Sequence, residues 1–221
     1  MDDWRVVLYP LGFLSAIAFG LRFIIQWLQS EKARKSIVTP LFWKISLIGN
    51  ILLMIHSFIQ IQFHISVIQA LNAVVSWRNL NLMQTKSKPV TKNRVIAYFF
   101  AAICFTSLAF WLQEAFFSHD SNWYRTPLAP WQTTQGISPS FFWNFFGTVG
   151  YCLFSSRFWI QWWYAEKAQT SVLPLLFWWL SLSGALISII YFIYIKDSVN
   201  IIGMAFGIVP YIRNIIILNK T

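Results

Sequence analysis

RFIIQWLQSEK, residues 22–32, decides the fold because its pattern of polar residues recurs later in the chain as RFWIQWWYAEK, residues 157–167. The two stretches match at a constant offset of 135 residues, and the matched pairs are Arg22/Arg157, Phe23/Phe158, Gln26/Gln161, Trp27/Trp162, Glu31/Glu166 and Lys32/Lys167. Identities continue outward at the same offset through Gly12/Gly147, Ser36/Ser171, Phe42-Trp43/Phe177-Trp178, Ser46/Ser181, Gly49/Gly184 and Arg78-Asn79/Arg213-Asn214. The sequence therefore predicts one structural unit that is used twice.

The composition predicts an integral membrane protein. Of 221 residues, 57% are hydrophobic and only 11% are charged, which is too apolar to cover a soluble globule. The net charge of +10 comes from basic residues in short segments between apolar runs, where lipid headgroups and membrane orientation explain them. We therefore expect no nucleic-acid partner. Cys104 and Cys152 lie inside apolar runs, which predicts buried, unreactive thiols and no metal or cofactor site.

Seven apolar runs have about the length that crosses a bilayer, roughly 20 residues. They fall near residues 6–28, 37–59, 64–83, 95–117, 141–164, 172–195 and 198–218. We predict an all-α protein with a three-helix repeat (1–84), a segment with a basic linker, connector helix and external loop (85–140), and a second three-helix repeat (141–221). Because three helices plus one is an even number, both repeats enter the membrane from the same side and are parallel.

The distribution of Lys and Arg predicts the orientation, since cytoplasmic connections are enriched in these residues. The richer side carries Lys32, Arg34, Lys35, Lys86, Lys88, Lys92, Arg94, Lys167 and Lys220, and the poorer side carries Arg5, Arg125 and Lys196. We therefore expect an external N-terminus and a cytoplasmic C-terminus. The long connection 118–140 is then external, and 85–94 is a basic cytoplasmic linker.

Proline and glycine mark positions within these helices. Pro40 and Pro174 are expected in the first turns of their helices, and Pro210 is expected to kink the last one. Small residues at four-residue spacing predict packing seams between helices. These residues are Gly12, Ala16, Gly20, Gly203 and Gly207.

The duplicated arginines are the first candidates for a site, because a guanidinium inside a bilayer is costly and normally faces protein or water. Arg22 and Gln26 share a helical face, and Arg157 and Gln161 repeat this spacing. Two such faces either line a central pocket, or each arginine extends to the interface or pairs with Glu31 or Glu166.

Arg78 and Arg213, each followed by asparagine, add two more guanidinium groups near the same predicted membrane depth. Guanidinium groups bind phosphate in a bidentate manner, so a phosphorylated headgroup is a fitting ligand; the alternative is that both are positive-inside anchors. The Glu-Lys pairs are expected to begin short loops, and they are either solvated turns or part of the site. His56 is interpreted as structural, because the repeat places Tyr191 there.

No catalytic motif is present: we find no Ser-His-Asp set, HExxH, P-loop or paired carboxylates. We therefore name no catalytic residue. The ligand-binding candidates are Arg22, Gln26, Trp27, Arg78, Arg157, Gln161, Trp162 and Arg213, supported by Glu31, Lys32, Asn79, Glu166, Lys167 and Asn214.

The pattern LYPLGFL, RFxxQWxxSEK, PLFWxxSLxGNxLLMIHxFIQ and RNLNL closely resembles the lipid A biosynthesis N-terminal domain family. Members occur as short membrane proteins and as membrane extensions of some lipid-A-disaccharide synthases, and HSFIQIQ (56–62) with WRNLNL (77–82) is similar to the chlamydial type. The resemblance implies a bacterial inner-membrane protein. In such synthases a separate soluble domain transfers the sugar, so we expect this chain, which ends at Thr221, to lack that domain and not to be an enzyme by itself.

The three-plus-one-plus-three arrangement is also similar to SWEET sugar transporters and the PQ-loop clan. The Pro-Gln dipeptide of that clan is absent, since Pro40 and Pro174 are each followed by leucine. Three hypotheses follow: a protein of lipid A or glycolipid biosynthesis that binds or translocates an anionic lipid or lipid-linked sugar, with a glycosyltransferase as possible partner; a SWEET-like transporter of a soluble sugar; or a structural membrane anchor.

Overall fold

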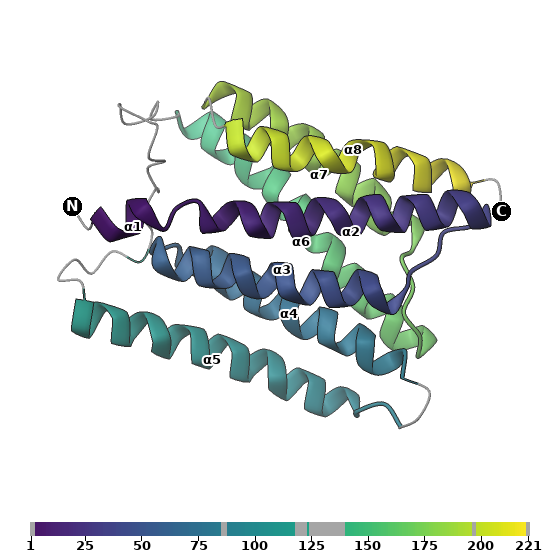
Figure 1. The fold of residues 1–221 in the computed structure, drawn as a ribbon, viewed down its shortest axis with the longest axis horizontal. Coiled ribbons are helices and arrows are strands. Elements are labelled where there is room, and N and C mark those ends of the chain that lie inside the picture. The colour runs from purple at the N-terminus through teal and green to yellow at the C-terminus, as the bar shows by residue number, and fades with distance from the viewer. Residues whose placement is uncertain (1–2, 85–87, 118–122, 124–139, 196–197, 220–221) are drawn as a thin grey trace. The chain divides into compact units, whose positions relative to one another are not determined.

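The computed structural model describes residues 3–84, 88–117, 123, 140–195 and 198–219, and these residues are helical apart from short connections. Seven of the helices have 20 or more residues, and a five-residue helix precedes them (Figure 1). In chain order they are α1 (Asp3–Val7), α2 (Leu11–Ala33), α3 (Pro40–Ile59), α4 (Phe63–Leu82), α5 (Lys92–Phe117), α6 (Phe141–Ala168), α7 (Leu175–Tyr194) and α8 (Ser198–Leu218).

Five helical stretches are long and apolar enough to cross a membrane: Arg5–Ala33, Pro40–Ile59, Lys92–Phe116, Leu175–Tyr194 and Asn200–Leu218. The seven long helices coincide with the seven predicted runs, and α4 and α6 are the two that fall outside this group. Both carry a buried arginine; α4 adds four buried amides, and α6 adds the buried Gln161 and Glu166, and these polar residues lower the hydropathy of the two helices. That α4 and α6 span the membrane, and in which orientation, stays a prediction.

The proline positions explain where the structure departs from the predicted ends. The first run is divided at Pro10, which lies between α1 and α2, and α2 continues to Ala33, beyond the predicted end. Pro40 is the first residue of α3, as expected, whereas Pro174 precedes α7 in an extended conformation. Pro210 lies inside α8. Most of the predicted external loop and part of the basic linker lie outside the described residues.

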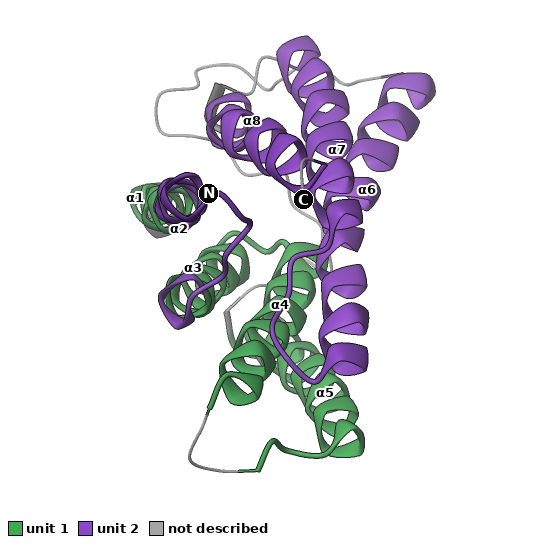
Figure 2. Cartoon of the chain, turned by 90° about the vertical axis from the view of Figure 1, so that its right-hand side faces the viewer, with its two compact units in different colours: residues 1–19, 43–135 green, residues 20–42, 136–221 purple. Residues whose placement is uncertain are grey.

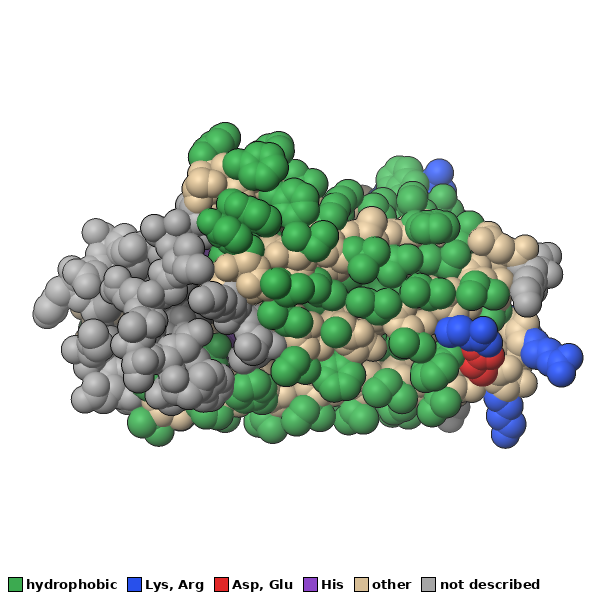
Figure 3. Space-filling model, turned by 90° about the horizontal axis from the view of Figure 1, so that it is seen from above, with side chains coloured by type: hydrophobic (Ala, Val, Ile, Leu, Met, Phe, Trp, Pro, Cys, Tyr) green, Lys and Arg blue, Asp and Glu red, His purple; other side chains and the backbone are tan. Residues whose placement is uncertain are grey.

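Polar side chains are buried and large apolar side chains are exposed, as expected when the surrounding solvent is lipid. Arginine, glutamine, asparagine and serine make up most of the buried polar set, while Phe100, Phe105 and Phe141 are 65%, 66% and 87% exposed. Among the described side chains on the face drawn in Figure 3, hydrophobic ones predominate. The prediction of buried thiols is wrong: Cys104 and Cys152 are free and exposed, because apolar helix faces tolerate a small hydrophobe.

The chain divides into two compact units (Figure 2). Unit 1 comprises residues 1–19 and 43–135, and unit 2 comprises residues 20–42 and 136–221. In unit 1, α4 packs on α5; in unit 2, α7 packs on both α6 and α8, and the second half of α2 joins them. These units differ from the predicted domains, which were defined by the sequence duplication and not by compactness. The predicted domains stay a prediction.

Close helix approaches recur at positions 135 residues apart. A Cβ on Gly12 would lie 3.0 Å from the His56 ring, and one on Gly147 would lie 2.7 Å from the Tyr191 ring. His56 therefore packs as a structural residue.

The next matched glycines repeat the pattern, because a Cβ on Gly49 would meet Phe19 at 2.7 Å and one on Gly184 would meet Phe154 at 2.5 Å. Gly20 and Gly203 were also predicted as seam residues, but they have no such neighbour within 4 Å among the described residues. The prediction of a seam is wrong at these two positions.

Candidate functional site

Two buried arginines form the centre of unit 2. Arg22 on α2 is 2% exposed and Arg157 on α6 is 3% exposed. Their guanidinium carbons lie over the same two rings: Arg22 is 4.7 Å from the Phe23 centroid and 5.3 Å from that of Phe158, and Arg157 is 5.6 and 4.8 Å from them. Both guanidinium groups are therefore enclosed by protein side chains within unit 2.

Aromatic side chains enclose the pair, and we call them the aromatic box: Phe23, Phe42, Phe154, Phe158, Phe177 and Tyr211. Phe154 is nearest, with its centroid 3.4 Å from the Arg157 guanidinium carbon. Ring faces attract a cation by about 0.5–2 kcal/mol each, so the box compensates part of the cost of burying the guanidinium groups.

Tyr211 supplies the one polar contact that Arg157 has among the described residues. Nη1 of Arg157 donates a hydrogen bond of 3.1 Å to the Tyr211 hydroxyl oxygen, whereas its Nε has no hydrogen-bond partner. The three glutamates of the described chain accept hydrogen bonds from indole N–H groups instead: Glu31 from Trp27, Glu114 from Trp123 and Glu166 from Trp162. The positive charge of Arg157 therefore has no carboxylate beside it in the described chain.

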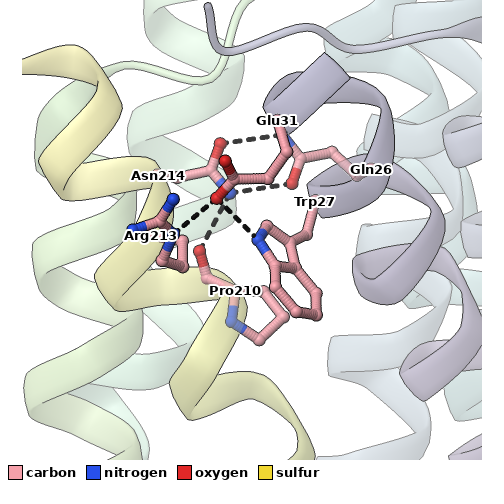
Figure 4. A network of polar contacts seen from close by, with 6 residues as sticks. All are labelled: Gln26, Trp27, Glu31, Pro210, Arg213 and Asn214. Carbon is pink, nitrogen blue, oxygen red and sulfur yellow. Dashed lines mark hydrogen bonds and ion pairs between the residues drawn. The ribbon is translucent and has the colours of Figure 1, made fainter. Parts of the chain in front are cut away.

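A polar network joins α2 to α8 next to the box, and Figure 4 shows Gln26 and Asn214 within it. The side-chain amides of Gln26 and Asn214, both buried, donate to each other at 2.9 Å. Ser36 donates to the Asn214 carbonyl oxygen at 3.1 Å, and Gln26 donates to the backbone carbonyl of Ile37 at 3.2 Å. These bonds fix the end of α2 and the following loop against α8.

The outer part of this network is a carboxylate shared by two donors. Glu31 accepts a hydrogen bond of 3.0 Å from Trp27 Nε1 and forms an ion pair with Arg213 (Figure 4). The side chains of Arg213 and Glu31 are 43% and 32% exposed. Arg213 is thus held at the partly exposed side of the network, away from the rings of the box.

Matched residues make matched contacts. Gln161 donates to the carbonyl of Val172 at 3.1 Å, as Gln26 does to that of Ile37, and Trp162 donates to Glu166 as Trp27 does to Glu31. The ring pairs Phe23/Phe42 and Phe158/Phe177 have the same separation of 5.8 Å and the same interplanar angle of 68°. The identities at the 135-residue offset therefore keep local contacts as well as residue types.

Two of the predicted residues, Arg78 and Asn79, belong to unit 1. Nη1 of Arg78 donates to Asn81 at 2.9 Å and to the carbonyl of Val90 at 2.7 Å, and Asn79 donates to the carbonyl of Val75. These bonds tie the linker to the end of α4.

The Glu-Lys pairs were predicted to begin short loops, but both lie within the last turns of α2 and α6. Glu166 is buried, so the interpretation as a solvated turn is wrong for this residue. Lys32 is exposed, and the Lys167 ammonium lies 4.9 Å from the Trp163 centroid.

The sequence interpretation missed Tyr211 and the box itself. Tyr211 aligns with Ser76 at the 135-residue offset, so the duplication gave no signal for it. The phenylalanines did leave a signal, because Phe23/Phe158, Phe42/Phe177 and Phe19/Phe154 are all matched pairs.

Comparison with known proteins identifies relatives over nearly the whole chain. It is 36% identical over 214 residues to a lipid-A-disaccharide synthase of Chlamydia pneumoniae, which covers 97% of this chain and 34% of the relative. It is 36% identical over 219 residues to that of Chlamydia caviae and 32% identical over 213 residues to that of Chlamydia trachomatis serovar D, covering 97% and 96% of this chain and 33% and 34% of those relatives. The chain thus spans about a third of the length of these relatives.

No solved structure matches the chain significantly. The family model of the Lipid A Biosynthesis N-terminal domain matches it twice, over residues 11–81 and again over residues 146–216. These two matches begin and end 135 residues apart and contain both arginines of the pair. The chain belongs to the Lipid A Biosynthesis N-terminal domain family.

Proposed function

We propose that this protein binds the anionic headgroup of a lipid or lipid-linked sugar in lipid A or related glycolipid biosynthesis, and that Arg22 and Arg157 hold its phosphate. One observation carries the proposal: a guanidinium that is 3% exposed and has no carboxylate partner among the described residues. Burying an uncompensated charge costs several kcal/mol, which is comparable to the whole free energy of unfolding of a single domain. We therefore expect such a charge where a ligand neutralises it.

The other predicted residues take supporting roles in this proposal. Gln26 and Gln161 hold the loops that follow α2 and α6 through the carbonyls of Ile37 and Val172. Trp27 and Trp162 orient the two glutamates, and Asn214 joins α8 to α2. The partly exposed Arg213 is suited to attract an anion toward the site.

The membrane arrangement belongs to the same proposal. In it, two parallel three-helix repeats flank a connector helix in a bacterial inner membrane, and the N-terminus is external. This arrangement would present the headgroup near the cytoplasmic interface. The relatives are named for lipid-A-disaccharide synthesis, so a glycosyltransferase is the partner to which this chain would present its lipid. The alternative activity is movement of the lipid between the two leaflets.

A thermal-shift titration of the detergent-purified protein tests the proposal. Phosphatidic acid at a hundredfold excess over its Kd should stabilise the wild type by about 2.7 kcal/mol, which is about 5–10 °C in melting temperature. The Arg22→Gln/Arg157→Gln double variant should lose this rise, because the cations that hold the phosphate are gone.

The matched control is the Lys35→Gln/Arg94→Gln double variant, which removes the same charge from exposed positions and should keep the rise. An undiminished rise in the arginine-pair variant, or an equal rise with phosphatidylcholine, would refute the proposal. A rise with soluble sugars but not with lipids would favour the transporter hypothesis instead.

A further inference from the structure

We infer that Trp178 is a further ligand-binding residue beside Arg157, and that its indole N–H donates a hydrogen bond to an unesterified oxygen of the ligand's phosphate. This inference rests on the proposed function and names a new contact in the same site. Trp178 is the fourth residue of α7, and it belongs to unit 2, as do Arg157 and every residue of the aromatic box.

A buried hydrogen-bond donor without an acceptor carries the inference. Trp178 is 0% exposed, and its Nε1 has no hydrogen-bond partner among the described residues. An indole N–H can only donate, and a buried one usually has an acceptor because an unmade hydrogen bond in the interior costs stability. Trp178 therefore needs an acceptor that the described part of the chain does not supply.

Three other tryptophans show which acceptor suits an indole N–H in this chain. Trp27, Trp123 and Trp162 donate to glutamate carboxylates at 3.0, 2.7 and 3.1 Å. Hydrogen bonds to an ionised oxygen are stronger than those to a neutral one. A phosphate oxygen carries negative charge and only accepts, as these carboxylate oxygens do, so it is a fitting partner for the Trp178 N–H.

The ring of Trp178 adjoins the aromatic box at three of its members. Its centroid lies 5.0 Å from that of Phe177, 6.2 Å from that of Tyr211 and 6.3 Å from that of Phe23. The Arg157 guanidinium carbon lies 5.8, 5.8 and 5.6 Å from the same three centroids, and Nε of Arg157 also has no hydrogen-bond partner among the described residues. Two buried donors without acceptors thus lie around the same rings, and one phosphate has enough oxygens to accept from both.

The beginning of α7 favours an anion beside Trp178. The N-cap residue, Pro174, makes no side-chain cap hydrogen bond, and the first turn of α7 has no acidic residue. Helical side chains lean toward the N-terminus of their helix, so the Trp178 side chain is directed toward this end of α7. The positive end of the helix dipole therefore adds to the attraction of an anion by the indole N–H.

The experiment measures the Kd of phosphatidic acid by native mass spectrometry for the wild type, Trp178→Phe and Trp43→Phe. Trp43 is the matched residue in the first repeat; it is also 0% exposed, and it belongs to unit 1, so both changes remove an indole N–H and the same volume from a buried position. Trp178→Phe should weaken binding about tenfold or more, because a hydrogen bond to a charged acceptor is lost. Trp43→Phe should leave the Kd unchanged.

A second measurement needs no variant, so a folding defect cannot obscure it. In the wild type with isotope-labelled tryptophan, an indole N–H resonance should move downfield when phosphatidic acid is added, because the proton gains an anionic acceptor. That resonance should be missing from the spectrum of Trp178→Phe.

Three results would overturn the inference and leave the proposed function intact: an equal Kd for the wild type and Trp178→Phe, an equal loss in both tryptophan variants, or no downfield shift of an indole resonance. Failure of the wild type to bind phosphatidic acid would refute the proposed function itself. Millimolar inorganic phosphate should not displace phosphatidic acid, and displacement would overturn a lipid as the source of the phosphate.

Discussion

Replacing Gly184 by alanine is expected to lower the melting temperature of the detergent-purified protein by about 5 °C or more, the largest loss among the glycine positions. A Cβ at this position would lie 2.5 Å from the backbone nitrogen and 2.8 Å from the Cα of Phe154. Backbone atoms cannot rotate away, so α7 must separate from α6, at a cost of about 2 kcal/mol or more after the gain in helix propensity. The displaced residue is a wall of the aromatic box.

Gly203→Ala provides the matched control within α8. A Cβ at Gly203 meets no such neighbour within 4 Å in the described chain, so only the helix-propensity gain of up to about 1 kcal/mol remains. We expect its melting temperature to equal or exceed that of the wild type. Equal melting temperatures for the Gly184 and Gly203 variants would contradict the close approach of α6 and α7.

Replacing Arg157 by methionine is expected to stabilise the lipid-free protein while it abolishes binding of phosphatidic acid. Replacement of buried charged groups by well-packed apolar residues often gains about 1–4 kcal/mol. Here it also removes one of two like charges over the Phe23 and Phe158 rings. Functional sites often reduce stability in this way, whereas a purely structural arginine does not.

Replacing Arg78 by methionine is expected to destabilise the lipid-free protein. Arg78 is also buried, but its guanidinium donates to Asn81 and to the backbone carbonyl of Val90. Its loss removes both of these hydrogen bonds and leaves Asn81 with the Val90 N–H as its remaining donor, at a cost of about 1–3 kcal/mol. Melting curves of the two lipid-free variants should therefore shift in opposite directions, and a parallel loss of stability would support the hypothesis of a structural anchor.

The helices and the arginine pair could be predicted from the sequence because both leave local signals. The seven apolar runs match α2 to α8, and the 135-residue offset identified Arg22 and Arg157 before any contact was known. The side-chain partners of Gln26 and Glu31 could not be predicted in this way. Their partners, Asn214 and Arg213, lie 188 and 182 residues away, and the pairing of helices so distant in sequence has no periodic signal.

Two other differences have identifiable physical reasons. Buried thiols were expected because Cys104 and Cys152 lie in apolar runs, but an apolar run in a membrane protein has a face toward lipid as well as a face toward protein. Tyr211 was missed because its role depends on the space beside Gly207, where a Cβ would lie 2.3 Å from the phenol. That Gly207 leaves room for the ring of Tyr211 can be seen only in the folded helix.

Native mass spectrometry of the protein purified from bacterial membranes tests the arginine-pair site most directly. The wild type should retain a phosphorylated lipid that is absent from the folded Arg22→Gln/Arg157→Gln variant and present on the Lys35→Gln/Arg94→Gln control. The same bulk phospholipids on all three proteins, in the same proportions, would contradict a phosphate site at Arg22 and Arg157.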